Sequence, residues 1–462
     1  MNRDLPSRIW IDVEDLFQYA QSHPRISGIQ RVMFELCTAL RADPHSAGRL
    51  GFVRHGAAPG DCVEVGWDSI AALVARLSTG PSSTASRMSL TRPPPPGGIK
   101  GRVVRGILGL PREVEEPLGA ILRSHFAAIK SWVQLVRGIV ALARRRRRVV
   151  GGDAAPIRPG DMLLLLGSPW ALPDHVGWID AATQRHGLRV ALLVYDLIQL
   201  RFEEFFDPIG VERFRAWLDA ILPRCEAIFA ISHATAADTE LRLREIGLSD
   251  APRVVALPMG TGFTPVAPLI SPALPAPGSY VLIVGTIEAR KNHLAAFRAW
   301  RRLLATMPRA QVPKLVFAGR PGALVADLMQ QLVNTHGLGG KIIVIPDACD
   351  AEMTALYEGC LFTLFPSYAE GWGLPVSESL AFGKPCLCAD RTSLPEAGMG
   401  LARLFDPDDL NDLVAQLRAL ISNPDDLADW TARVRAQFQP VPWSLTAARL
   451  LDGLSQARTS AP

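Results

Sequence analysis

The chain of 462 residues is longer than one hydrophobic core normally supports, so we expect two domains. Hydrophobic residues make up 48% of the sequence and charged residues 20%, which is typical of a globular protein and excludes an intrinsically disordered one. The formal net charge of +4 is too small to indicate binding to nucleic acid, so no such partner is expected.

The seven cysteines are odd in number and show no Cys-x-x-Cys spacing, which argues against a disulfide framework and against a zinc site. This usage fits a reducing cytoplasm. The N terminus, MNRDLPSRIW, has no apolar signal region, and no run approaches the roughly 18 apolar residues that span a bilayer. We therefore expect a cytoplasmic protein whose contact with a membrane is peripheral.

Short apolar runs alternate with helical patterns along most of the chain. Such alternation indicates parallel sheets covered on both faces, and hence an α/β protein with two Rossmann-like, doubly wound domains that face a cleft. The expected strands lie at 8–13, 161–166, 189–194, 227–231, 253–257, 280–284, 314–318, 341–345, 361–365 and 385–389. We expect the N-terminal domain at 1–265, a proline-rich linker at 266–279 and the C-terminal domain at 280–440.

An insertion at about 80–155 interrupts the N-terminal domain. It begins with a stretch rich in Pro, Gly, Ser and Arg that is typical of a flexible segment. Residues 119–148 then show a basic amphipathic helical pattern that ends in the cluster Arg144 to Arg148. This pattern favours a helix lying on an anionic membrane surface, while a helix packed on the N-terminal domain with a solvated basic end is the alternative.

Two polar loops follow expected strands of the second half. Arg290 and Lys291 come after the strand at 280–284 and before a helix, where backbone amides and side-chain charges together suit an anion such as a nucleotide diphosphate. In YAEGWGLPVSES, Glu370 lies in a glycine loop after the strand at 361–365, and Glu378 is expected in the first turn of the next helix. Such carboxylates can accept the hydroxyl groups of a ribose or of a sugar.

The stretches GTIEARKN, PSYAEGWGLPVSES and LAFGKPCLCAD together resemble the C-terminal domain of retaining glycosyltransferases of the GT-B fold, family 4 type. The resemblance implies that Arg290 and Lys291 neutralise the donor diphosphate, that Glu370 contacts the donor sugar, and that Glu378 binds the ribose. It also implies that 441–462 form a helix that crosses back to the N-terminal domain. The further donor-binding residues that it implies are Gly28, Gly285, Ile345, Gly371, Trp372, Gly373 and Leu374.

In the first half, the resemblance implies that Gly28 belongs to a glycine loop, which approaches the donor diphosphate from the opposite domain. Arg31 is either a helix-surface residue or a cleft residue. Tyr195 and Asp196 occupy the place of the family's His-Asp pair, so an imidazole role is in doubt there while Asp196 remains a candidate for acceptor contact. Ser232 is interpreted as a helix cap at least as well as a catalytic residue.

No Asp-x-Asp pair ends a strand in the manner of metal-dependent transferases; Asp12, Glu14 and Asp15 come closest. Because two cations can take over the charge role of a metal, we expect no metal and no other cofactor. The stretches SGIQRV, YDLIQL and EARKN resemble bacterial mannosyltransferases of polysaccharide assembly, which implies transfer of mannose from GDP-mannose to a glycan or lipid-linked glycan. The alternatives are a UDP-hexose transferase, a nucleotide-sugar epimerase and a non-catalytic scaffold.

Overall fold

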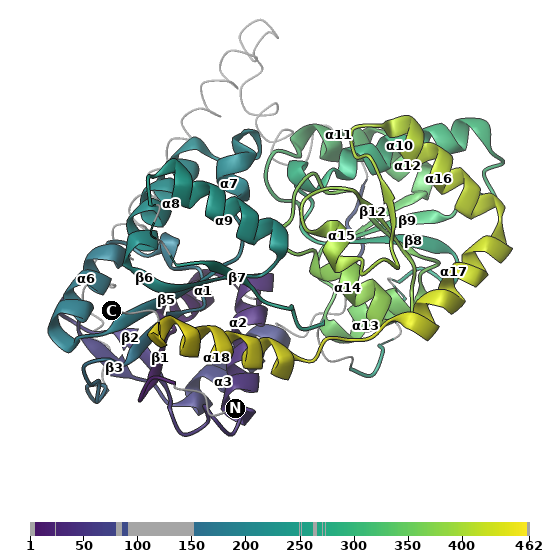
Figure 1. Ribbon diagram of the computed structural model, residues 1–462. Coiled ribbons are helices and arrows are strands. Elements are labelled where there is room, and N and C mark those ends of the chain that lie inside the picture. Colours follow the sequence, from purple (N-terminus) through teal and green to yellow (C-terminus); the bar gives the residue numbers. More distant parts are fainter. Residues whose placement is uncertain are drawn as a thin grey trace, which may run out of the picture. The chain divides into compact units, whose positions relative to one another are not determined.

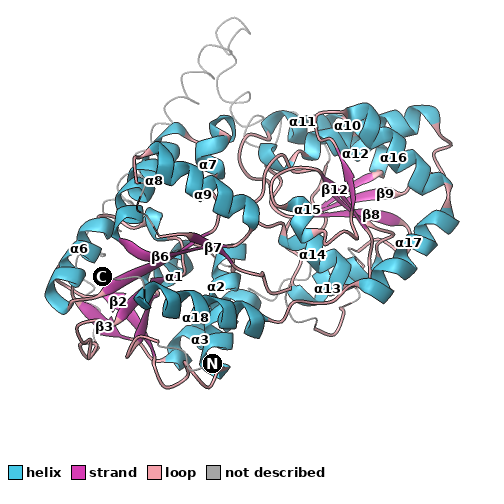
Figure 2. Cartoon of the chain, in the orientation of Figure 1, coloured by secondary structure: helices cyan, strands magenta, loops and turns pink. Residues whose placement is uncertain are grey.

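The computed structural model describes residues 5–23, 25–79, 86–90, 152–248, 250, 252–261, 266–269, 271–272 and 274–459. These residues form two α/β lobes, each built on one sheet (Figures 1 and 2). The fold class expected from the sequence is therefore confirmed. The predicted basic helix at 119–148, and most of the predicted insertion, lie outside the described residues.

The N-terminal lobe contains a seven-stranded sheet in the order β3-β2-β1-β4-β5-β6-β7, in which only the β2–β3 pair is antiparallel. Its strands are β1 (Ile9–Asp12), β2 (Leu50–His55), β3 (Cys62–Glu64), β4 (Met162–Leu165), β5 (Arg189–Val194), β6 (Cys225–Ala230) and β7 (Val254–Ala256). Its helices are α1 (Glu14–Ser22), α2 (Gly28–Ala42), α3 (Trp67–Thr79), η1 (Pro169–Ala171), α6 (His175–His186), α7 (Ile198–Arg201), η2 (Glu203–Phe205), α8 (Pro208–Ile221), η3 (Leu222–Arg224) and α9 (His233–Glu245).

The C-terminal lobe contains a parallel six-stranded sheet in the order β10-β9-β8-β11-β12-β13. Its strands are β8 (Tyr280–Val284), β9 (Lys314–Ala318), β10 (Ile342–Ile345), β11 (Thr363–Phe365), β12 (Cys386–Ala389) and β13 (Arg403–Phe405). Its helices are η4 (Ala289–Lys291), α10 (His293–Thr306), α11 (Ala326–Asn334), α12 (His336–Gly340), α13 (Asp350–Gly359), α14 (Leu374–Ala381), α15 (Leu394–Ala397), α16 (Leu410–Ser422) and α17 (Pro424–Gln437).

Both sheets are covered on both faces, as their continuous apolar strands predict. In β1, Ile9 and Ile11 enter one buried cluster while Trp10 enters another. In β8, Ile283 and Leu282 divide between two clusters in the same way. All seven cysteines are unpaired, and six of them are buried, in agreement with the expectation that they form no disulfide framework.

The last helix, α18 (Trp443–Thr459), contributes to the N-terminal lobe although it follows the C-terminal lobe in the chain (Figure 1). It packs on α2 and β6, and Leu450, Leu451 and Leu454 belong to the buried core of that lobe. Trp443 lies so close to Gly260 that a Cβ atom there would be 2.2 Å from its ring. Among the helices of the described residues, none combines the length and the apolar character needed to cross a bilayer.

Candidate active site

The predicted phosphate and sugar residues follow the two strands between which the order of the second sheet reverses. From β8 the chain proceeds outward to β9 and β10, and it then returns to β11 beside β8. Loops after adjacent strands diverge at such a switch point, and ligands of open α/β sheets bind there. The loop after β8 carries Arg290 and Lys291, and the loop after β11 carries Glu370.

These three side chains form one ion-pair cluster. Glu370 accepts from Lys291 Nζ at 3.1 Å, and its other carboxylate oxygen lies 3.1 Å from Arg290 Nη1. Burial works against ionisation of Glu370, but the positive charges of Arg290 and Lys291 lower its pKa to about 2. At neutral pH the carboxylate is therefore ionised, so it can support a cationic sugar but cannot donate a proton.

Glu288 is a fourth charged member of this cluster, and the sequence analysis did not single it out. Its carboxylate lies 2.7 Å from Arg290 Nη2, and Arg290 Nη1 also donates to the carbonyl of Ala369. Burial opposes the charge of Arg290, but Glu370 and Glu288 hold its pKa above the ordinary value. Two cations thus face two carboxylates, so a diphosphate must compete with carboxylates for both cations.

The glycine loop around Glu370 is tightly enclosed. A Cβ atom on Gly371 would lie 2.3 Å from the carbonyl oxygen of Tyr195, so only glycine fits there. Gly373 has a φ of +99°, which L residues rarely adopt, and it precedes α14, which begins with Leu374. Trp372 is partly buried between the apolar clusters of both lobes.

Glu378 lies deeper, on α14, where it is 8% exposed. It is the fifth residue of this helix and lies at the start of the second turn, so the prediction that it lies in the first turn was wrong by about one residue. It accepts a hydrogen bond of 2.7 Å from the hydroxyl of Tyr357 on α13. Burial raises the pKa of Glu378, although the Tyr357 bond acts in the opposite direction.

Gly285 and Ile345 are two further predicted donor residues, and their surroundings differ. Gly285, directly after β8, has a φ of +132° and faces Lys291, whose Nζ would lie 3.3 Å from an added Cβ atom. Ile345 is fully buried at the end of β10, and its carbonyl accepts from Gly319 N. The side chain of Ile345 is therefore part of the core, and its carbonyl oxygen is engaged by a backbone amide. Two carbonyls of the residues that follow, those of Asp347 and Ala348, accept from Arg25.

The predicted residues of the N-terminal lobe divide into exposed and buried groups. Gly28 is the exposed first residue of α2, and Leu374 lies 3.6 Å from the place of its absent Cβ atom. Arg31 forms an ion pair of 3.4 Å with Asp350. Tyr195 is buried, and its hydroxyl donates to the carbonyl of Leu166 at 2.6 Å, so this hydroxyl is committed to the protein interior.

Asp196 follows Tyr195 and accepts from the backbone amide of Ile198 at 3.1 Å. Burial raises its pKa, while the nearby charge of Arg290 opposes the rise. Asp196 is thus electrostatically coupled to Arg290 and Glu370 of the ion-pair cluster. Ser232 caps α9 by accepting from Thr235 N at 3.0 Å, and His233 is exposed, which favours the capping interpretation of that segment.

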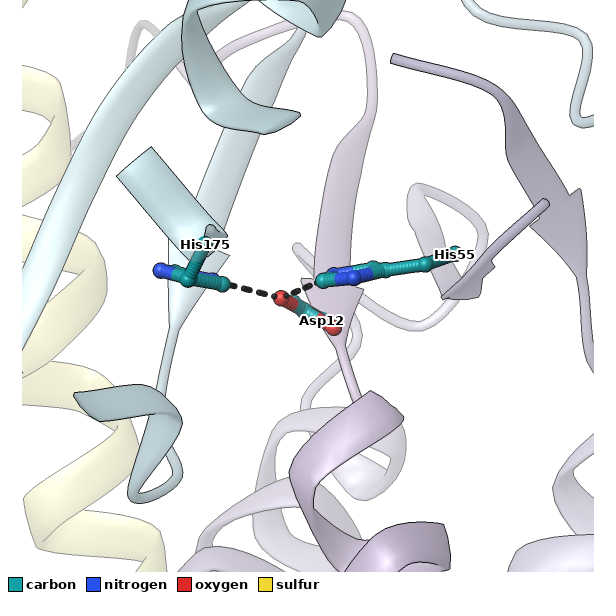
Figure 3. A group of neighbouring side chains, drawn as sticks. All are labelled: Asp12, His55 and His175. Carbon is teal, nitrogen blue, oxygen red and sulfur yellow. Dashed lines mark hydrogen bonds and ion pairs between the residues drawn. The ribbon is translucent and has the colours of Figure 1, made fainter. Parts of the chain in front are cut away.

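Asp12, His55 and His175 form a second polar cluster, at the ends of β1 and β2 and the start of α6 (Figure 3). Both histidine Nε2 atoms lie close to Asp12 Oδ2, His55 at 3.0 Å and His175 at 3.1 Å. Burial works against the charge of Asp12, but the two histidines hold its pKa well below the usual range. Three ligand-type side chains in this arrangement raise the question of a metal ion.

The neighbouring Trp217 determines which ring nitrogen of His175 carries the proton. Trp217 Nε1 donates to His175 Nδ1 at 3.2 Å. His175 Nδ1 must then be an acceptor, so in the neutral ring the proton sits on Nε2 and donates to Asp12. A metal ion on Nε2 would move this proton to Nδ1, where it would face the Trp217 N–H group. The hydrogen bonds therefore favour a proton over a metal ion at this place.

A cavity of about 790 Å³ lies elsewhere on the N-terminal lobe. It is lined by residues of β6, β7, α9 and α18, and none of the predicted donor residues contributes to it. The charged cluster after β8 and β11 remains the better candidate site, because it lies at the switch point of its sheet, where ligands of open α/β sheets bind.

Comparisons with known proteins found similarity to enzymes that transfer sugars. Residues 271–437 match the family model described as "Glycosyl transferases group 1". The serotype-specific mannosyltransferase WbdA of Escherichia coli is 26% identical over 278 residues, which cover 58% of this chain and 33% of that protein. O-antigen chain mannosyltransferase B of Escherichia coli is 31% identical over 164 residues, or 36% of this chain and 42% of that protein.

The matches thus span a third to about two fifths of these relatives. Among solved structures, Anabaena HepE in complex with UDP and glucose superposes with a TM-score of 0.56 at 14% identity, covering 97% of this chain and 100% of that chain. This likeness shows the shared fold, with two α/β lobes. Residues 271–437 thus match the model of the glycosyl transferases group 1 family, and the architecture of the chain is that of the GT-B fold.

Proposed function

We propose that this protein is a retaining, metal-independent hexosyltransferase that moves mannose from GDP-mannose to a hydroxyl group of a glycan or lipid-linked glycan. The observation that carries the proposal is the cluster of Arg290, Lys291 and Glu370 at the switch point of the second sheet. The family match supports the reaction class, and the names of the two Escherichia coli relatives support mannose as the sugar.

The charges of the cluster suggest how the residues divide the work. Arg290 and Lys291 would hold the leaving diphosphate and stabilise the charge that develops on it, which is the role a metal ion has in other transferases. Glu370, ionised at neutral pH, would face the sugar as its anomeric carbon becomes positive. Glu378 would accept the ribose hydroxyls, because it lies one helix turn deeper and is oriented by Tyr357.

Replacement of Glu370 by Gln tests this division directly. Glutamine keeps the shape of the side chain but releases Arg290 and Lys291 from their ion pairs. We expect turnover of GDP-mannose to fall about 100-fold or more, because a charge aimed at the transition state is lost. Binding of GDP, measured by thermal shift, should be unchanged or tighter. Unchanged turnover would contradict the role of Glu370.

A donor panel tests the nucleotide and the sugar. GDP, UDP and their mannose and glucose derivatives are compared by thermal shift and then by transfer to a mannose-containing glycan. Stabilisation by UDP-glucose but not by GDP-mannose would favour the UDP-hexose alternative. Conversion of the donor without an acceptor would indicate an epimerase. Activity that survives EDTA is expected, whereas loss of activity that Mn²⁺ restores would contradict metal independence.

The proposed membrane partner depends on the sequence pattern at 119–148, which lies outside the described residues. Sedimentation with anionic liposomes tests it, using the full chain and a variant that lacks residues 113–150. A variant in which Arg144 to Arg148 are replaced by Gln serves as the matched control for charge. Undiminished binding by the deletion variant would reject this segment as the anchor.

A further inference from the structure

The turn after β12 contains a backbone conformation that its side chain does not favour. Thr392 has a φ of +50°, in the left-handed region. A β-branched residue is strained there, because its side chain crowds the backbone. Glycine and asparagine adopt this region with much less strain, so the threonine side chain must contribute something that they cannot.

Thr392 and its neighbour Ser393 hold the backbone of Glu370. The amide of Glu370 donates to Thr392 Oγ1 at 2.9 Å, and the same hydroxyl donates to the carbonyl of Glu370 at 3.0 Å. Ser393 is fully buried, and its Oγ lies 2.8 Å from the Glu370 carbonyl oxygen and 2.9 Å from that of Trp372. Two hydroxyls thus occupy both backbone polar groups of Glu370.

This backbone restraint matters because the other restraints on Glu370 are exposed to competition. Glu370 lies between β11 and α14, so neither a strand nor a helix holds its backbone. The carboxylate is held by Arg290 and Lys291, which are the same cations that the proposed diphosphate would engage. Once a donor binds, the hydrogen bonds from Thr392 and Ser393 are independent of the phosphate.

We propose that Thr392 and Ser393 are positioning residues, which fix the backbone of Glu370 so that its carboxylate stays at the sugar while the diphosphate occupies Arg290 and Lys291. This inference rests on the proposed function. It explains why a strained threonine stands where an unstrained residue would fit: its hydroxyl accepts and donates at the same time, as the two backbone groups require.

Three substitutions of Thr392 separate positioning from a structural role. Thr392→Ser keeps the hydroxyl, Thr392→Val keeps the branch but loses the hydroxyl, and Thr392→Gly loses both. We expect turnover to depend on whether residue 392 carries a hydroxyl group. Turnover of Thr392→Ser should stay within about threefold of the parent, whereas that of Thr392→Val and Thr392→Gly should be about 10- to 100-fold lower. The melting temperature should instead follow backbone strain, so that the Gly variant is more stable than the Val variant.

The dissociation constant of GDP should stay within about twofold in all three variants, because the cations are untouched. In the Glu370→Gln background, Thr392→Gly should lower turnover little further, since both changes act on one group. Thr431→Val, which removes a hydroxyl bound to Leu427 within α17, is the matched control and should leave turnover unchanged. Turnover that tracks melting temperature rather than the hydroxyl would overturn the proposal.

A second measurement does not depend on activity. Hydrogen exchange of a peptide spanning residues 368–374, in the presence of saturating GDP, should speed up at the Glu370 amide in the Val and Gly variants but not in the Ser variant. Unchanged exchange would overturn the proposed positioning even if turnover fell. If the parent transfers no hexose from any donor, the proposed function fails, and the exchange experiment still decides whether Thr392 fixes Glu370.

Discussion

Asp15 is a buried carboxyl group whose replacement by Asn should change how stability depends on pH. Asp15 is 5% exposed, and its Oδ2 atom accepts a hydrogen bond from Ser168 N at 2.7 Å. Burial, only partly offset by the Ser168 amide, raises its pKa from the ordinary 3.8 to about 6. The folded state therefore holds this proton more tightly than the unfolded state does.

The sign of the effect follows from that difference. The contribution of the protonated Asp15 is fully present below pH 3.8 and is lost as the pH rises through about 6. Above that, an ionised carboxylate stays buried. The difference between a pKa of 3.8 and one of about 6 corresponds to about 3 kcal/mol as an upper limit. An asparagine can accept from Ser168 through Oδ1 and carries no charge at any pH, so it avoids this loss.

Thermal unfolding of the parent and of Asp15→Asn at pH 5 to 8 tests this reasoning. The melting temperature of the variant minus that of the parent should rise across this range by about 2 to 5 °C, because about half of the 3 kcal/mol is lost between pH 5 and 8 and the rest is lost below pH 5. Packing differences shift the whole curve but not its slope. A difference that does not change with pH would refute the reasoning.

Asp12→Asn is the contrasting variant for this experiment. Asp12 accepts from His55, His175 and the amide of Glu14, so an amide group would turn an N–H toward one of these donors. Its folded pKa is depressed, so its contribution is present above the ordinary pKa of 3.8 and is lost only as the pH falls below that value. Asp12→Asn should lower the stability at pH 7 by about 3 kcal/mol.

Two further substitutions probe the C-terminal lobe. Gly319→Ala should destabilise the protein by about 3 kcal/mol, because the added Cβ atom would lie 2.0 Å from the backbone oxygen of Gly285 and neither backbone can move away. A melting curve like that of the parent would contradict this prediction. Tyr357→Phe should weaken donor binding about fivefold to tenfold by leaving Glu378 without its orienting hydroxyl, with turnover at saturation preserved; equal affinities by calorimetry would contradict it.

Sequence patterns predicted those strands that are apolar on both faces, because burial in a parallel sheet imposes a recognisable run of residues. They missed β2, β3 and β13. In β2, Arg54 and His55 interrupt the apolar pattern, and only the structure shows that these polar side chains meet Glu14 and Asp12 on neighbouring elements. The partners of a buried charge are far apart in the chain, so a local pattern cannot reveal them.

The same limit applies to the candidate site. Arg290 and Glu370 are 80 positions apart in the chain, yet the strand order of a doubly wound sheet made it reasonable to expect them together. The positive φ of Thr392 left no trace in the sequence, since threonine is not a residue that predicts this conformation. Glu288 lies in GTIEARKN, two positions before Arg290. This spacing of a carboxylate and a cation was the pattern in the sequence that could have identified Glu288.

The position of α18 has a consequence for the order in which the protein folds. Leu450, Leu451 and Leu454 complete the core of the N-terminal lobe, although the ribosome makes them only after the C-terminal lobe. The lobe that is synthesised first thus keeps an uncovered apolar surface until the C-terminal lobe has been synthesised, a state that favours aggregation. A fragment that stops near residue 440 should therefore need a chaperone, or the α18 peptide added in trans, to stay in solution.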